Sequence, residues 1–263
     1  MAQGIVGLAE NHKLKGFFKK SRTLHDQALY MRRKVLGEKH HAVAESLFHI
    51  AEILLIEANF EDAVRGYDDA LAMLRVALDN AHPKVADTME GLGKVQFAQG
   101  RILDAKFSHE RVLSMRKQVL GANHPAIGDS QYQIALVNFK LGKIDQAGAL
   151  FERCLVTIRD SRGSRHPLVA TCMYNIAEVN SVSGKFFKAE ELYMEALKIR
   201  LQVFNNFNVN HIDIAESYYG LAENYRLRGL YDHLEPVKGK KYGKEHKFTT
   251  MVMPEVDVDD FNR

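Results

Sequence analysis

Histidine is the residue type in this sequence that most clearly suggests metal chemistry, because the chain contains 12 of them. Packed helices lie about 8–10 Å apart, whereas the ligands of a zinc ion each lie within about 2.1 Å of it. Five of the histidines recur at equivalent positions of an internal repeat. Because equivalent positions lie on different packed helices, these histidines cannot share one ion. We expect them to cap helices or to form hydrogen bonds between copies, and we predict no metal site and no cofactor. The five recurring histidines are His40, His82, His124, His166 and His211.

Two further patterns could carry catalysis, a glycine pair and two cysteines. Gly91 and Gly93 form a GxG, but they lie inside an expected helix with no preceding strand, which does not fit a phosphate-binding loop. Cys154 occupies a position that is alanine in other copies, so we expect a small buried side chain there. Cys172 has no obvious base beside it, and a reactive thiol needs a nearby base or cation. The sequence therefore predicts a protein that is not an enzyme.

Composition places the chain among soluble globular proteins, with 46% apolar and 26% charged residues. The longest apolar run, residues 53–56, is far shorter than the roughly 20 residues that span a bilayer, so we expect no membrane contact. A formal charge of +3 is too small to indicate nucleic acid by itself. Two cysteines cannot form a disulfide framework, which favours a reducing compartment and a cytoplasmic location. Residues 1–28 are basic, as in a mitochondrial transit segment, but they also fit the repeat described next.

The elements that must position these residues follow from an internal repeat. His82-Pro83, His124-Pro125 and His166-Pro167 recur at a step of 42 residues, and proline suits the first turn of a helix. Each segment whose apolar residues have helical spacing is followed by a residue that readily adopts the left-handed conformation in which helices often end. These residues are Gly100, Gly142, Gly184 and Gly229, with Ala58 in the matching position of an earlier copy.

Small residues within the repeat predict how its helices pack. An alanine recurs early in each second helix, where it would let two antiparallel helices approach closely. No segment shows the sustained alternation that is typical of strands. Each copy is therefore predicted to be a helix–turn–helix hairpin, and the fold to be an all-α solenoid. The recurring alanines are Ala63, Ala105, Ala147 and Ala189.

The repeat resembles the tetratricopeptide repeat in its longer form, which is found in kinesin light chains and nephrocystin-3. The segments that carry this resemblance include RKQVLGANHPAIGDS at 116–130 and EELYMEALKIR at 190–200. The resemblance implies a right-handed superhelical solenoid of antiparallel helix hairpins over residues 1–235. Residues 236–263 lose the periodicity, and we expect this charged tail to be disordered. The copies span about 1–40, 41–82, 83–124, 125–166 and 167–211, with a partial copy at 212–235.

The resemblance also implies where a partner binds, because the first helices of tetratricopeptide repeats line a concave groove. Amide side chains suit a peptide backbone, since they both donate and accept hydrogen bonds. Tyrosine offers rigid contact area with a polar tip, although packing between copies explains the tyrosines equally well. The predicted groove residues are His49, Lys94, Tyr132, Gln133, Asn138, Tyr174, Asn175, Glu178, Tyr219 and Glu223.

These observations favour a non-catalytic scaffold or adaptor that binds an extended peptide or a partner helix. One alternative is a cargo adaptor like kinesin light chain, whose partner would be a motor heavy chain or a cytoskeletal protein. Only Asn175 keeps part of that family's asparagine pair, and the many acids nearby disfavour an acidic cargo peptide. A second alternative is a regulatory or sensor fragment of a larger signalling protein. Nucleic-acid or microtubule contact through the lysines at 238–247 is a further hypothesis.

Overall fold

The computed structural model describes residues 2–121, 124–204 and 212–229, and within these ranges it contains eleven α-helices and no strand. The predicted all-α fold is confirmed. None of the described helices is both long and apolar enough to cross a membrane. The first helices of the hairpins are α1 (Ala2–Leu14), α3 (His41–Ile56), α5 (Pro83–Ala98), α7 (Pro125–Lys140), α9 (Pro167–Val182) and α11 (Ile212–Leu227). The second helices are α2 (Phe18–Leu36), α4 (Phe60–Ala77), α6 (Ile102–Leu120), α8 (Ile144–Arg162) and α10 (Phe186–Phe204).

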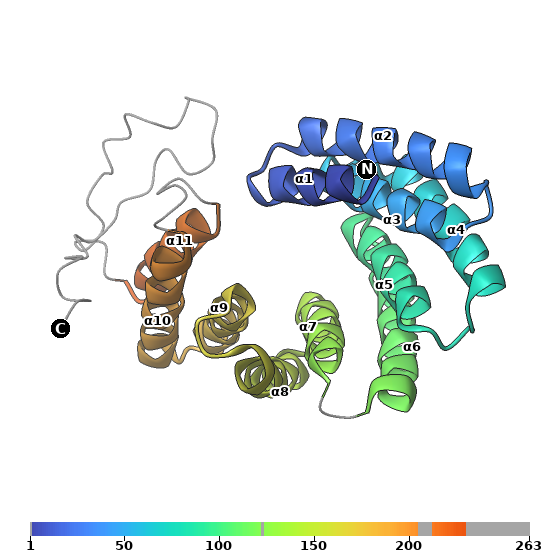
Figure 1. The fold of residues 1–263 in the computed structure, drawn as a ribbon. Coiled ribbons are helices and arrows are strands. Elements are labelled where there is room, and N and C mark those ends of the chain that lie inside the picture. Colours follow the sequence, from blue (N-terminus) through green and yellow to red (C-terminus); the bar gives the residue numbers. More distant parts are fainter. Residues whose placement is uncertain (1, 122–123, 205–211, 230–263) are drawn as a thin grey trace. The chain divides into compact units, whose positions relative to one another are not determined.

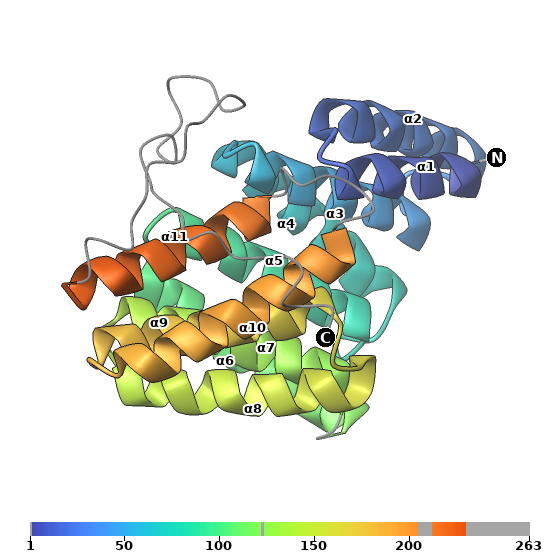
Figure 2. The ribbon, with the colours of Figure 1, turned by 90° about the vertical axis from the view of Figure 1, so that its left-hand side faces the viewer.

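The described residues divide into two compact units, the first ending at Val137 and the second beginning at Asn138. In the first unit the hairpins α1–α2, α3–α4 and α5–α6 follow one another (Figure 1). The two helices of each hairpin contact each other, and α2 contacts α3 and α4 contacts α5, so each hairpin packs on the next. In the second unit α8, α9, α10 and α11 lie side by side in chain order (Figure 2). The predicted charged tail at 236–263 lies outside the described residues.

The recurring histidines begin the first helices. The Nδ1 atom of His40 accepts a hydrogen bond from the backbone N–H of Ala42 at 3.1 Å, and His82 does the same for Lys84 at 3.2 Å. His124 and His166 accept in the same way from the backbone N–H groups of Ala126 and Leu168, each at 3.2 Å. Each imidazole satisfies a backbone donor that the helix itself leaves unpaired. Helix capping is thus confirmed at these four positions, while His211 lies outside the described residues.

The turn between the two helices of a hairpin requires a left-handed residue. Gly100 and Gly142 have φ of 78° and 73° there, as the sequence predicts. Ala58 takes the same conformation with φ of 58°, although its Cβ makes this region unfavourable. The hairpin of α3 and α4 therefore closes through a strained residue where most copies have glycine.

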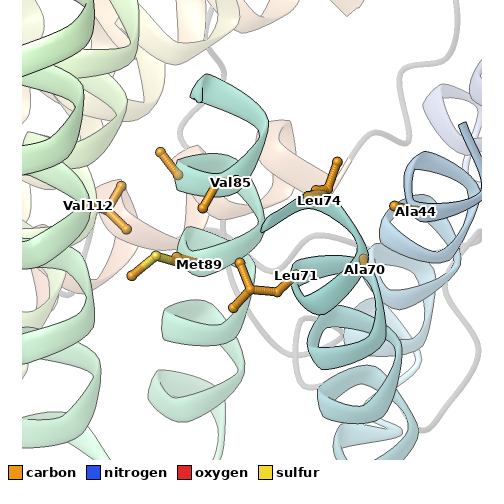
Figure 3. Close-up of a cluster of buried hydrophobic side chains, with 8 residues drawn as sticks. Ala44, Ala70, Leu71, Leu74, Val85, Met89 and Val112 are labelled. Carbon is orange, nitrogen blue, oxygen red and sulfur yellow. The ribbon is translucent and has the colours of Figure 1, made fainter. Parts of the chain in front are cut away.

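Within each unit, the core consists of buried apolar clusters that join neighbouring helices, both within a hairpin and between successive hairpins. Figure 3 shows one part of it, where Leu71 and Leu74 of α4 meet Val85 and Met89 of α5. The recurring alanines at positions 63, 105, 147 and 189 are completely buried, which confirms their predicted role in close packing. Because each copy buries its apolar face on the next, stability is shared between neighbouring copies.

The GxG of α5 also serves close packing. A Cβ atom on Gly91 would lie 2.4 Å from Cε1 of Tyr67, and a Cβ on Gly93 would lie 2.7 Å from Cε1 of His109. Tyr67 lies on α4, the helix before α5, and His109 lies on α6, the helix after it. The glycines therefore lie inside a helix, as the sequence predicts, and make room for buried rings.

Candidate partner-binding surface

All ten predicted groove residues lie on first helices. Asn138 is 4% exposed, so little of its side chain is accessible to a partner. The other nine are half-buried or exposed, and we call them the first-helix surface. Its members are His49 on α3, Lys94 on α5, Tyr132 and Gln133 on α7, Tyr174, Asn175 and Glu178 on α9, and Tyr219 and Glu223 on α11.

In the first unit, His49 belongs to a cluster of charged and imidazole side chains. Its Nδ1 lies 3.2 Å from Oε1 of Glu10 on α1 and 3.1 Å from Oε2 of Glu52 on α3. Its ring stacks on that of His25 on α2, with 5.0 Å between the ring centroids. His49 is therefore held in place by three helices.

Lys13 balances the acids of this cluster. Its ammonium lies 2.9 Å from Oε2 of Glu10 and 3.0 Å from Oε2 of Glu52. Burial alone would raise the pKa of Glu10, but hydrogen bonds from His25 and Lys13 outweigh it and lower that pKa to about 2. Burial also opposes the charge of Glu52, and His49 and Lys13 nevertheless lower its pKa. Both carboxylates are therefore ionised at neutral pH.

Lys94 belongs to a second charged network of the first unit. Its ammonium lies 3.2 Å from Oε1 of Glu90, which is itself buried. Arg116 of α6 donates a short hydrogen bond to Glu90 and a further one of 2.6 Å to Asp87. The predicted surface residue Lys94 is thus a partly exposed member of an ion network that extends into the core.

A buried arginine recurs in every second copy, and the sequence analysis missed it. Arg116 donates to the Ser130 hydroxyl at 2.7 Å and to the carbonyl of Ala126 at 3.2 Å, both on α7. Hydrophobic side chains fill the same position in the intervening copies. The signal that could have revealed it is the spacing of 84 residues, together with a serine on the next first helix. The equivalent pairs are Arg32 with Ser46, at 2.9 Å, and Arg200 with Ser217, at 2.8 Å.

In the second unit, Tyr174 of α9 packs on α10 of its own copy and lies close to Gly220 of the next copy. Its ring meets that of Tyr193 edge-on at 5.4 Å between centroids, and the guanidinium of Arg200 lies 5.1 Å from its centroid. Tyr193 donates a short hydrogen bond to Glu178, and burial together with this carboxylate raises the pKa of Tyr193. A Cβ atom on Gly220 would lie 2.5 Å from Tyr193 and 2.9 Å from Tyr174. The packing alternative for Tyr174 therefore has direct geometric support.

The other predicted groove residues of the second unit differ in how many hydrogen bonds fix their side chains. The side-chain amide of Asn175 donates to the carbonyl of Thr171, one turn earlier, at 2.8 Å. Glu223 accepts two hydrogen bonds from Arg226, at 2.8 and 2.5 Å, which lower its pKa. Tyr219 is 39% exposed and is therefore the aromatic ring of the predicted set that is most open to solvent.

The two cysteines lie together, which their spacing in the sequence does not suggest. Both are completely buried, and the Sγ atoms of Cys154 on α8 and Cys172 on α9 are 3.0 Å apart as free thiols. The expected small buried side chain at Cys154 is confirmed. Neither thiol is accessible to a substrate in this arrangement.

Comparison with known proteins agrees with this architecture. The tetratricopeptide repeat family matches residues 1–75, 46–118, 84–155 and 126–202. A comparison with curated proteins gave no match.

Solved structures with a similar fold include kinesin light chain-type and Rap proteins. A putative kinesin light chain from Podosopora anserina with nearly identical TPR-like repeats has a TM-score of 0.57 at 20% identity, over 77% of this chain and 96% of that one. BtubC (BKLC) from P. vanneervenii has a TM-score of 0.61 at 17% identity, over 84% and 85% of the two chains. The Rap conjugation gene regulator of plasmid pLS20, in complex with the Phr* peptide, has a TM-score of 0.65 at 14% identity, over 87% of this chain and 63% of that one.

The family match spans most of the sequence, and the helix hairpins, their histidine caps and their left-handed turns form the repeat that it describes. This chain therefore belongs to the tetratricopeptide repeat family, with a fold like that of kinesin light chain-type repeat arrays.

Proposed function

We propose that this chain is a non-catalytic protein-interaction scaffold that binds an extended peptide or a partner helix on its first-helix surface. The observation that carries the proposal is the position of the predicted contact residues on the first helices of a tetratricopeptide array, where nine of ten stay at least partly accessible. The similar Rap regulator is a peptide complex, which supports a peptide as the occupant.

The charges of this surface indicate the kind of partner. The sequence alone suggests an excess of acids that would repel an acidic peptide. In the structure several acids on or near this surface have basic partners: Lys13 lies beside Glu10 and Glu52, and Arg226 binds Glu223. Paired charges give little net field. We therefore expect a partner that binds through hydrogen bonds and apolar contacts, with an affinity that changes little with salt.

Affinity capture with mass spectrometry tests the proposal. The intact chain is compared with Tyr219→Ala on α11 and with Tyr30→Ala on α2, whose ring is 67% exposed and serves as a matched control on a second helix. Loss of a contact residue at a binding hot spot costs about 2 kcal/mol, or about thirtyfold in affinity. The prominent partner should be lost with Tyr219→Ala and kept with Tyr30→Ala. Equal capture by all three baits, or loss with Tyr30→Ala alone, would contradict the proposal.

Two narrower functions are also compatible with this surface. The similarity to a putative kinesin light chain favours a cargo adaptor, with a motor heavy chain or a cytoskeletal protein as partner and a cytoplasmic location. The similarity to a Rap regulator favours a regulatory or sensor module. Capture distinguishes them: an adaptor should recover a motor heavy chain, and a sensor module should recover a signalling protein.

A further inference from the structure

Three side chains from different helices of the first unit converge on one point. Glu10 lies on α1, His25 on α2 and His49 on α3, the helices at the amino-terminal end of the chain (Figure 1). One ligand atom from each, a carboxylate oxygen and two imidazole nitrogens, lies within 4.8 Å of the other two. The chain therefore gathers two imidazoles and a carboxylate, which are ligands that zinc prefers.

Two of the three distances between these atoms are close to those of a tetrahedral site. Oε1 of Glu10 lies 3.2 Å from Nε2 of His25 and 3.2 Å from Nδ1 of His49. Zinc binds nitrogen and oxygen at about 2.0–2.2 Å, which places neighbouring ligands of a tetrahedron about 3.3–3.5 Å apart. For these two pairs an ion would require displacements of a few tenths of an ångström, and the ligand nitrogens of His25 and His49 lie within 4.8 Å of each other. Without it, the same distances allow both imidazoles to donate hydrogen bonds to Glu10.

The surroundings hold two of the ligands in place. His25 is completely buried, and its Nδ1 has no hydrogen-bond partner among the described residues, so Nδ1 can carry the ring proton while Nε2 offers a lone pair. Lys13 binds Oε2 of Glu10 and leaves Oε1 directed at the imidazoles. This outer contact orients the carboxylate, as second-layer partners do in metal sites.

The site is specific to the junction of the first and second copies and is partly exposed. The positions equivalent to His25 and His49 in the next copy hold Tyr67 and Gly91, which pack against each other. Glu10, His49 and Glu52 have side-chain exposures of 33%, 26% and 31%, which gives an ion a path from solvent. Glu52 lies 3.1 Å from Nδ1 of His49, so either its carboxylate or a water molecule can supply a fourth ligand.

We propose that Glu10, His25 and His49 bind one divalent transition-metal ion of the zinc type. This proposal departs from the prediction of no metal site, which rested on histidines at equivalent positions of the repeat, whereas His25 and His49 occupy different positions. The ion would join the hairpin of α1 and α2 to α3, and so fasten the first copy to the second. Because it binds only the folded arrangement, it would raise the unfolding temperature of the chain.

Calorimetric titration of the untagged, chelator-treated chain with Zn²⁺ tests this proposal without any partner protein. We expect one ion per chain, and at least tenfold weaker binding in Glu10→Gln and in His49→Ala, with circular dichroism to check folding. His41→Ala, on the same helix as His49 but outside the cluster, is the matched control and should bind as the wild type does. The fully buried His25 is left unchanged because its replacement could disrupt the core.

Two outcomes would overturn the proposal. One is the absence of saturable Zn²⁺ binding by the folded wild-type chain. The other is equal binding by the wild type, Glu10→Gln and His49→Ala, which would place the ion on other histidines. If both variants fail to fold, the wild type decides: Co²⁺ should give the absorption bands of a tetrahedral complex, and Zn²⁺ should raise the unfolding temperature. The absence of both effects would refute the site.

Discussion

Replacement of Arg116 by leucine tests whether the recurring buried arginine holds the repeats together. Arg116 is 5% exposed and bonds to Glu90, Asp87 and Ser130. Leucine is a fair replacement because the preceding copy has Leu74 at this position, buried among apolar side chains. Arg116→Leu therefore removes the charge and the hydrogen bonds without removing most of the apolar contact.

The size of the effect follows from the group left behind. Without Arg116, Lys94 is the ionic partner that the described residues still give the buried carboxylate of Glu90, and its side chain is 41% exposed. Breaking a buried ion pair by removal of one member costs about 3–5 kcal/mol, so we expect a loss near the lower value, about 3 kcal/mol. The double variant Arg116→Leu with Glu90→Gln should recover at least half of that loss, because no unpaired charge remains buried.

The effect should also depend on pH. Burial raises the pKa of Glu90, but Lys94 and Arg116 outweigh it and hold that pKa below its usual value. A carboxyl with a lowered pKa stabilises the fold above its unfolded pKa, and this contribution is lost as pH falls through the folded pKa. The difference in free energy of unfolding between the wild type and Arg116→Leu should be largest near neutral pH. It should shrink as pH falls below about 4.3, the ordinary pKa of glutamate.

Urea unfolding followed by circular dichroism measures these differences. Arg65→Leu is the matched control, because the side chain of Arg65 is 74% exposed and its ion pair with Asp62 lies at the surface. Exposed pairs contribute about 0–1 kcal/mol, so this variant should be nearly neutral. A loss below about 1 kcal/mol for Arg116→Leu, or a double variant as unstable as the single one, would refute the reasoning.

Three further predictions test separate parts of the structure. Ala58→Gly should stabilise the chain by about 1 kcal/mol in urea unfolding, because it relieves a left-handed alanine, and destabilisation would show that the turn is not strained. Gly91→Ala should destabilise by about 1–3 kcal/mol, since its Cβ would overlap the ring of Tyr67, and an unchanged midpoint would contradict the close approach. Cys154 and Cys172 should resist alkylation in the native chain and react fully in denaturant, whereas rapid labelling of the native chain would disprove their burial.

The sequence predicts the features of this fold that depend on local chemistry. A histidine before Pro83 caps a helix because its side chain reaches a backbone donor two residues further on. Glycine at position 100 ends a helix because the turn needs a positive φ. Both effects involve residues within one turn of each other, so the repeated pattern of residue types is enough to identify them.

Contacts between helices required the structure. His25 and His49 occupy different positions of the repeat, and only the packing of α2 against α3 brings their rings together. Cys154 and Cys172 meet in the same way across α8 and α9. Tyr174 is compatible from sequence with both a surface and a packing role, and its contact with Tyr193 depends on the register of α9 against α10. Such registers depend on side-chain packing along whole helices, which the spacing of single residues does not specify.

Hydrogen exchange of the chain with and without its captured partner tests the central claim most directly. If the partner binds the first-helix surface, slowed exchange should concentrate in the first helices α5, α9 and α11, which carry Lys94, Glu178 and Tyr219. The exposed second-helix segments around Tyr30 and Phe107 should exchange at unchanged rates. Protection confined to second helices, or to residues 236–263, would contradict the proposed binding surface.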